Sequence, residues 1–326
     1  MGDNNPNISK VQYSLYDYQA DAVDNITEIY TSEGPHDRFA GVVLPTGGGK
    51  SFVAIQELLS ATFDEKGEFR LRTSEEIASL DRTGVLNSSP LLYVAPNREI
   101  LSQIKLHIVK NVLFGIPQLS EMTIDEIDAL VKADFPQLNF PGLNAQTEKG
   151  NDELVTDESS RSEKVQAILR HITPDQVDML VNNAFPGLRL KCYAGMKDKS
   201  SALEDELTES DLETENALII LDEAHRVGAE TWKVYIRDLI QKNAKAKILA
   251  ITATPERTDR DKNDMMHDIA EMVYPGEDIL SDEYIAKEII VLDAMRDGIV
   301  TAPRIIGYDA ALAESEEYKE IICKKR

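Results

Sequence analysis

Cysteine is nearly absent from this sequence, because Cys192 and Cys323 are the only two among 326 residues. Two thiols in so long a chain predict neither a disulfide framework nor a cysteine-based metal site, and a reducing, cytoplasmic compartment is expected. No apolar run approaches the ~18 residues of a membrane span. The first residues also lack the basic and apolar regions of a signal peptide. These absences argue against the secreted disulfide-rich and membrane-spanning classes.

Positive charge is also scarce. Lys and Arg number 35 against 58 Asp and Glu, which gives a formal net charge of −23. Such a balance argues against broad, non-specific adhesion to nucleic acid or to anionic membranes. It leaves open a narrow strand-binding face, which needs only a few local donors.

A glycine-rich stretch at residues 40–51 organises the chain. A short apolar run at 42–44 predicts a buried strand, and an apolar-periodic helix is expected from Phe52 to about Phe63. The glycines between them allow backbone N–H groups to surround phosphates at the helix start. In such a loop the lysine reaches the β- and γ-phosphates and the hydroxyl ligates Mg²⁺. The predicted phosphate-binding residues are Thr46, Gly47, Gly48, Gly49, Lys50 and Ser51. An ordinary glycine turn is the alternative, since the general pattern has glycine where this chain has Leu44.

Continuous apolar runs alternate with amphipathic helices along the chain. Further buried strands are predicted at 91–95, 218–221 and 247–251, with helices from about 14 to 30, 98 to 112 and 232 to 240. Fully apolar strands between such helices predict an α/β fold with a parallel sheet covered by helices on both faces. Ligands of such sheets lie beyond the carboxyl ends of the strands, and the polar motifs here follow the predicted strands directly.

The middle of the chain, about 115–190, has a different pattern. Residues 123–138 recur at 173–188 as a short helix with an F-P-x-L exit, offset by 50 positions. Two copies do not make a solenoid. We predict a mostly helical insertion between core strands, with a partner-docking role as the alternative. Residues 144–163 are polar and acidic with little to bury, so their deletion is expected to leave the fold intact.

Adjacent carboxylates follow the predicted strand 218–221. Asp222 is suited to hold Mg²⁺, and Glu223 to polarise the water that attacks the γ-phosphate. An acidic pair is usually only a solvated surface feature. Its position directly after a buried strand, in a chain with a phosphate loop, favours the catalytic interpretation.

Five stretches together resemble superfamily 2 helicases and translocases of the DEAH-box type, nearest the restriction-subunit-like branch. They are residues 16–19, 44–51, 94–103, 222–225 and 252–254, which occur in the family's order. The resemblance spans about 15–310 and implies the first RecA-like motor domain of a P-loop NTPase. It implies that Gln19 contacts adenine, and it places His225, Thr252 and Thr254 around the nucleotide. It also implies that Asn97, Arg98 and Tyr193 meet a nucleic-acid strand. Cys192 departs from the usual threonine before that tyrosine, which weakens the strand contact there.

The resemblance also implies a domain organisation. Residues 1–13 are expected to be a leader, residues 14–300 the motor domain, and residues 301–326 the start of a linker to a second motor domain that this sequence lacks. The implied function is that of an ATP-binding and ATP-hydrolysing motor of a helicase or translocase, with Mg²⁺ as cofactor and DNA favoured over RNA. Without a second domain, weak activity and weak strand binding are expected. The alternative is a nucleotide-binding regulatory or docking module without significant turnover. A P-loop kinase does not account for residues 96–99 or 252–254.

Overall fold

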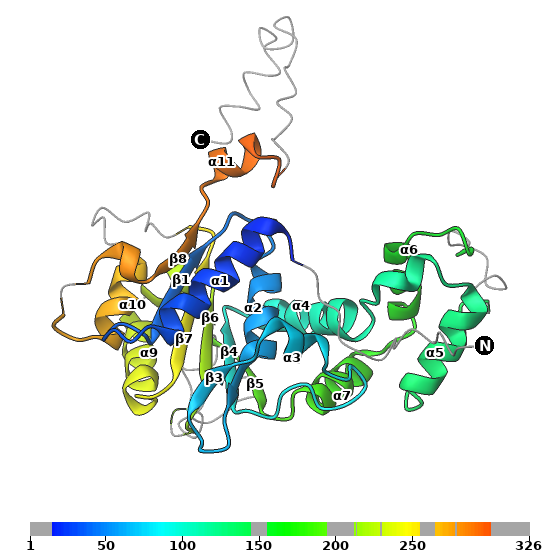
Figure 1. Ribbon diagram of the computed structural model, residues 1–326, viewed down its shortest axis with the longest axis horizontal. Helices are drawn as coiled ribbons and strands as arrows, with labels where there is room; N and C mark the ends of the chain where they lie inside the picture. Colours follow the sequence, from blue (N-terminus) through cyan, green and yellow to red (C-terminus); the bar gives the residue numbers. More distant parts are fainter. Residues whose placement is uncertain are drawn as a thin grey trace, which may run out of the picture.

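A computed structural model describes most of the chain (Figure 1). The residues described are 15–144, 155–193, 212, 214–228, 230–254, 265–277 and 279–300. Within this part, no helix combines the length and the hydropathy needed to cross a bilayer.

The strands are β1 (Phe39–Val43), β2 (Ala61–Phe63), β3 (Phe69–Leu71), β4 (Leu91–Ala95), β5 (Leu188–Cys192), β6 (Leu218–Asp222), β7 (Lys247–Thr252) and β8 (Ile285–Glu288). The α-helices are α1 (Asp17–Thr31), α2 (Lys50–Ser60), α3 (Ser74–Ala78), α4 (Arg98–Ile108), α5 (Ile124–Asp134), α6 (Arg161–Leu169), α7 (Pro174–Ala184), α9 (Glu230–Lys242), α10 (Met265–Val273) and α11 (Val291–Arg296). Shorter helical turns are η1 (Val109–Leu113), η2 (Pro117–Ser120), η5 (Ala224–Gly228) and η6 (Ser281–Glu283).

In the described part of the chain, six strands form one sheet in the order β5-β4-β6-β7-β1-β8. All five strand pairs are parallel. The short strands β2 and β3 form a separate antiparallel hairpin. The α/β fold with a parallel sheet is therefore confirmed, and β5, β8 and the hairpin are added to the strands expected from apolar runs.

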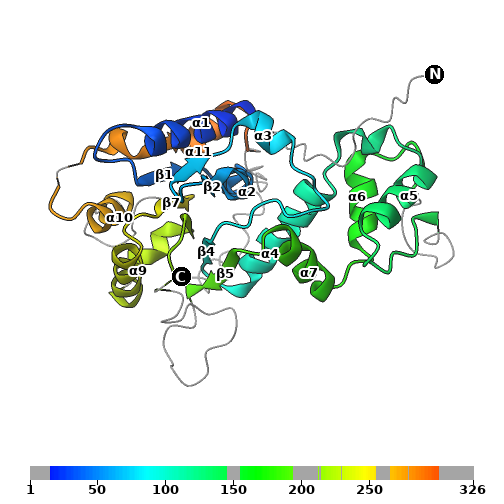
Figure 2. The same cartoon turned by 60° about the horizontal axis from the view of Figure 1, so that its bottom comes forward.

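Alternate residues of each central strand contribute to two separate apolar clusters. In β4, Leu91 and Tyr93 belong to the cluster under α1, α2 and α4, whereas Leu92 and Val94 belong to the cluster under α9 and α10. Helices thus cover both faces of the sheet, as Figures 1 and 2 show. This double burial explains why the strands are apolar throughout rather than alternating.

The helical middle of the chain extends from one end of the sheet, with α5 and α6 far from the strands (Figure 2). Its two repeated units fold alike. Thr123 and Thr173 each cap a helix of 11 residues, and Phe135 and Phe185 each end it with buried rings and φ values of −130° and −132°. Both copies pack into the same cluster as the sheet face under α2. The repeated sequence therefore forms the same short helix at two places, with the same residue types at its start and at its end.

None of residues 155–163 is buried, so the expectation that this stretch buries little holds for its described part, but the deletion expectation does not, because these residues make contacts that hold their neighbours. Lys164 at the start of α6 is fully buried, and its Nζ donates to the carbonyl oxygen of Asp157 at 2.9 Å. The Asp157 carboxylate in turn accepts from the backbone N–H of Ile124 at 2.7 Å. Val155 packs on the main apolar cluster. A deletion through residue 163 would therefore remove contacts that hold α5 and α6; residues 145–154 lie outside the described part.

Candidate nucleotide site

The phosphate loop connects β1 to α2, in the predicted order of strand, loop and helix. Gly47 and Gly49 have φ values of 84° and 77°, a region that residues with a Cβ rarely adopt. Gly48 has no such φ, but a Cβ there would lie 2.9 Å from the carbonyl oxygen of Pro45. Each of the three positions therefore has its own steric reason to be glycine. Helix α2 begins at Lys50, two residues before the predicted start, so Lys50 and Ser51 lie in its first turn.

Lys50 lies against the acidic end of β6. Its Nζ is 3.5 Å from Glu223 Oε1, and the two side chains are only 13% and 24% exposed. Strands β1 and β6 are separated by β7, and their carboxyl ends share one edge of the sheet because Val43 pairs with Thr252 and Asp222 pairs with Ile251. Glu223 has a φ of 49°, the one positive value recorded for a residue other than glycine in the described part. Such backbone strain concentrates at functional sites.

Asp222 is more buried than Glu223, and both of its oxygens are held. Tyr93 donates its hydroxyl to Oδ2 at 2.7 Å, and the backbone N–H of Glu223 donates to Oδ1 at 2.9 Å. Burial raises the pKa of Asp222, although the hydrogen bond from Tyr93 opposes this. The pKa of Glu223 is lowered, mainly by its hydrogen bond with His225 and further by Lys50. The adjacent carboxylates therefore have different environments and opposite pKa shifts.

His225 links the ends of β6 and β7. Its Nδ1 lies 3.3 Å from Glu223 Oε2 and 3.0 Å from Thr252 Oγ1. A proton on Nδ1 satisfies both contacts, with Thr252 donating its hydroxyl to the carbonyl oxygen of Thr254 at 3.2 Å. The backbone N–H of Thr254 returns a hydrogen bond to Thr252 Oγ1. Residues predicted from two separate motifs thus form one connected network.

Gln19 lies beside the loop but is only 2% exposed. A Cβ on Gly49 would collide with its amide nitrogen. Its Oε1 accepts from the backbone N–H of Tyr16 at 3.0 Å, so the side chain caps α1. This cap explains why α1 begins at Asp17 rather than near residue 14. The proposed contact with adenine remains a prediction.

Tyr18 is a site residue that the sequence reasoning missed. Its hydroxyl donates to the carbonyl oxygen of Gly48 at 3.1 Å, which ties α1 to the phosphate loop. Tyr18 lies within the stretch 16–19 that contributes to the family resemblance, but its spacing also fits the apolar stripe of the helix, so the sequence did not single it out.

The residues predicted to meet a nucleic-acid strand differ in their exposure. Arg98 is exposed at the first turn of α4, and Asn97 caps that helix by accepting from the backbone N–H of Ile100 at 3.0 Å. Tyr193 is 2% exposed, and its ring packs edge-to-face on Trp232 with centroids 5.3 Å apart. Its predicted strand contact is corrected: after β5 the apolar contact with α9 draws this ring into the core.

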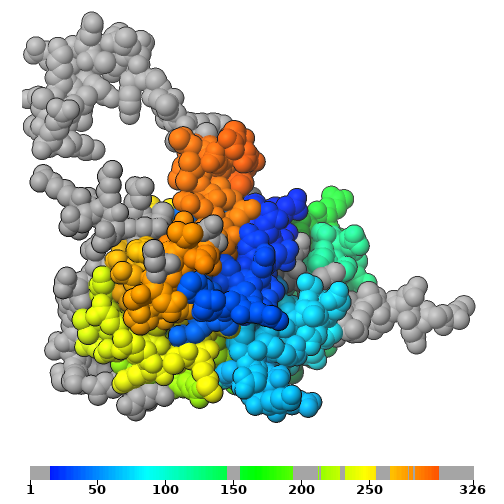
Figure 3. Space-filling view, turned by 60° about the vertical axis from the view of Figure 1, so that its left-hand side comes forward, coloured from blue at the N-terminus to red at the C-terminus, as the bar shows by residue number. Residues whose placement is uncertain are grey.

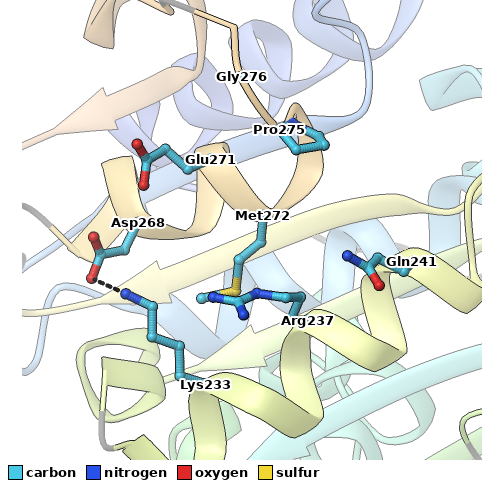
Figure 4. Close-up of a pocket in the computed structure, with 8 residues that line it drawn as sticks. All are labelled: Lys233, Arg237, Gln241, Asp268, Glu271, Met272, Pro275 and Gly276. Carbon is cyan, nitrogen blue, oxygen red and sulfur yellow. Dashed lines mark hydrogen bonds and ion pairs between the residues drawn. The ribbon is translucent and has the colours of Figure 1, made fainter.

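Two hollows lie outside this network. One of about 310 Å³ lies between α9 and α10, which are adjacent in Figure 3. There the ammonium of Lys233 faces the buried carboxylate of Asp268 at 3.4 Å, and Arg237 extends along Met272 (Figure 4). The other, about 690 Å³, lies at the amino edge of the sheet beside Arg38 and Lys247. Neither contains a residue of the predicted nucleotide site.

Among the described residues, no group of three or more His, Cys, Asp and Glu side chains could hold a metal ion by itself.

Comparison with known proteins gives the family. Residues 12–257 match the family model described as the res subunit of type III restriction enzymes. The chain belongs to that family. This agrees with the helicase-like resemblance of the sequence, whereas the DEAH-box branch remains a prediction. A search of curated proteins found no match.

Among solved structures, 18 chains match the res-subunit-family chain. One is the helicase domain of Hef from Pyrococcus furiosus, with 17% identity and a TM-score of 0.30. The match covers 80% of this chain and 36% of that one, so this chain spans about a third of that structure's length.

Proposed function

We propose that this chain is the first motor domain of an ATP-dependent helicase or translocase, acting on DNA more than on RNA. The ion pair between Lys50 and Glu223 is the observation that carries the proposal. It brings the phosphate-loop lysine and the carboxylate after β6 to one edge of the sheet. A loop that served only as a turn would need neither partner.

The residues present fit ATP with Mg²⁺. The loop has the positive φ angles of a phosphate cradle, and α2 begins directly after it at Lys50, so the positive end of the helix dipole meets the loop. Ser51 and Asp222 would hold the metal ion. When bound, Mg²⁺ neutralises charge on the phosphate oxygens and helps to align them.

Glu223 is proposed as the residue that orients the attacking water. Its lowered pKa keeps it ionised at neutral pH, so it can accept a hydrogen bond from water. His225 fixes its second oxygen and connects it to Thr252 and Thr254. We propose that this network reports the state of the nucleotide to the rest of the domain.

We also propose that residues 14–300 act as one motor domain, with 115–190 as a helical insertion, and that Arg98 and Asn97 contact the strand. This proposed contact offers few positively charged side chains, and the net charge of the whole chain is −23. Each phosphate contact adds a salt-dependent term to affinity. Single-strand binding by residues 1–326 should therefore be weak and fade at physiological salt, without strand separation.

One observation favours a second candidate, a nucleotide-binding module without significant turnover. Both carboxylate oxygens of Glu223 are already engaged, Oε1 by Lys50 and Oε2 by His225. A carboxylate held on both sides is poorly placed to orient water unless nucleotide binding displaces one partner. The two candidates share a site and differ in the rate of hydrolysis.

The test compares binding and turnover in matched variants. Lys50→Ala should weaken Mg-ATP binding severely, whereas Lys66→Ala, at an exposed hairpin position, should not. Glu223→Gln should retain binding while hydrolysis falls. Equal affinity of Lys50→Ala and the wild type in calorimetry would refute the phosphate-loop assignment. Residual hydrolysis that is equal in the wild type and in Glu223→Gln would favour the second candidate.

A further inference from the structure

Tyr93 connects the strand before α4 to the predicted metal ligand. It is the third residue of β4, is 1% exposed, and pairs in register with Ile220 of β6. Both side chains belong to the apolar cluster on the α2 face of the sheet. From there the Tyr93 hydroxyl reaches Asp222 Oδ2 at 2.7 Å, across 129 positions of sequence.

The carboxylate of Asp222 has little freedom of its own. Only 8% of the residue is exposed, and each oxygen accepts one hydrogen bond, from Tyr93 or from the backbone N–H of Glu223. The backbone donor belongs to the next residue of the chain, Glu223, and is not a side chain that can rotate. Among the described residues, Tyr93 is therefore the one side chain whose hydrogen bond sets the rotation of this carboxylate about its bond to Cβ.

A tyrosine here could be only a large core residue. The buried tyrosines of the described chain allow a comparison, because the hydroxyls of Tyr30 and Tyr193 have no hydrogen-bond partner there. Burying an unpaired hydroxyl costs free energy. Among the described residues, neither of these two hydroxyls makes a hydrogen bond to a carboxylate. Tyr93 differs in that its hydroxyl is paired with a charged acceptor at short distance.

We propose that Tyr93 is a positioning residue that holds the Asp222 carboxylate in the orientation required to receive Mg²⁺ with the nucleotide. The inference rests on the proposed function. Hydrogen-bond partners behind a metal ligand orient it before the ion arrives, and their loss typically lowers metal affinity or activity by about 10- to 100-fold. Tyr93 does not touch the nucleotide in this assignment; it acts through Asp222.

The test measures how much Mg²⁺ tightens the binding of a fluorescent ADP analogue to residues 1–326. Tyr93→Phe keeps the ring and removes the donor, so affinity without Mg²⁺ should stay unchanged. The gain in affinity on adding Mg²⁺ should shrink by about 10- to 100-fold. Tyr30→Phe is the matched control, since it removes a buried hydroxyl without a partner, and it should keep the full gain.

A second arm combines Tyr93→Phe with Asp222→Asn. Because the tyrosine acts only through the carboxylate, it should cause no further loss of the Mg²⁺-dependent gain in that background. An unchanged gain in Tyr93→Phe would overturn the inference. So would a loss that is equal with and without Mg²⁺, or an undiminished loss in the Asp222→Asn background. A wild-type chain whose nucleotide affinity ignored Mg²⁺ would instead overturn the proposed function itself.

Discussion

Glu57 provides a quantitative test of the packing beneath the phosphate loop. It lies in α2, two turns after Lys50, with no exposed surface. Ser60 donates its hydroxyl to Glu57 Oε2 at 3.4 Å, while Oε1 has no hydrogen-bond partner in the described structure. Burial raises the pKa of this carboxyl from 4.5 to about 8. At neutral pH the folded chain therefore holds Glu57 as the neutral acid.

The stability consequence follows from proton linkage. Between pH 4.5 and about 8 the folded state keeps a proton that the unfolded chain releases. The free energy of unfolding therefore falls as pH rises through this window and levels off above it. The whole rise in pKa, from 4.5 to about 8, corresponds to a loss of about 5 kcal/mol in the free energy of unfolding. About 3 kcal/mol of this loss falls between pH 6 and pH 9.

Glu57→Gln removes the titration and keeps the shape of the side chain. Urea unfolding of both proteins at pH 6 and pH 9 should show the variant losing about 3 kcal/mol less than the wild type over that range. Glu65→Gln, at an exposed position, is the control and should follow the wild type. Parallel pH profiles for the wild type and Glu57→Gln would show that Glu57 is not a buried neutral acid.

Three further expectations concern stability. His36 bonds Glu277 and Glu283, mainly the former, which raises the pKa of its ring. The charged ring should contribute fully to the free energy of unfolding below its ordinary pKa of 6.5, and this contribution should vanish as pH rises through the raised pKa. In denaturant titrations, His36→Asn should therefore destabilise the fold by less than about 1 kcal/mol at pH 6 and should have no effect at pH 9. Lys164 Nζ donates among four carbonyl oxygens at 2.8–3.2 Å, so Lys164→Met should cost about 3–5 kcal/mol in chemical unfolding. Thr173→Ala removes the cap of α7 and should cost about 1 kcal/mol, measured by calorimetry.

The sheet could be predicted because its strands are apolar throughout, and this pattern reflects burial on both faces. The phosphate loop could be predicted because each glycine answers a local steric demand. Both properties are encoded within a few neighbouring residues. The shared edge at which Lys50 meets Glu223 then follows from the parallel topology alone.

Contacts that depend on the tertiary path could not be predicted in this way. The Tyr93 hydroxyl finds Asp222 only because β4 and β6 are neighbours in the sheet. The family resemblance implied that Tyr193 meets a nucleic-acid strand, but Trp232 of α9 offers its ring an apolar contact. Carbonyl groups of residues 119, 120, 122 and 157 surround the buried ammonium of Lys164, and no local pattern of the sequence indicates this. In each case the deciding partner is far away in sequence.

The same topology gives the proposed site a mechanical consequence. In the described part of the chain Lys50 has one acidic partner, Glu223, and a phosphate entering the loop would compete with that carboxylate for the lysine. Once Lys50 turns to phosphate, Glu223 Oε1 becomes available to water while Oε2 stays held by His225. In this scheme the same step that displaces Lys50 also makes the Glu223 carboxylate available. The hydrogen bond between His225 and Thr252 connects this change at the end of β6 to the end of β7. In the proposed function, nucleotide binding itself therefore prepares the residue that uses the water.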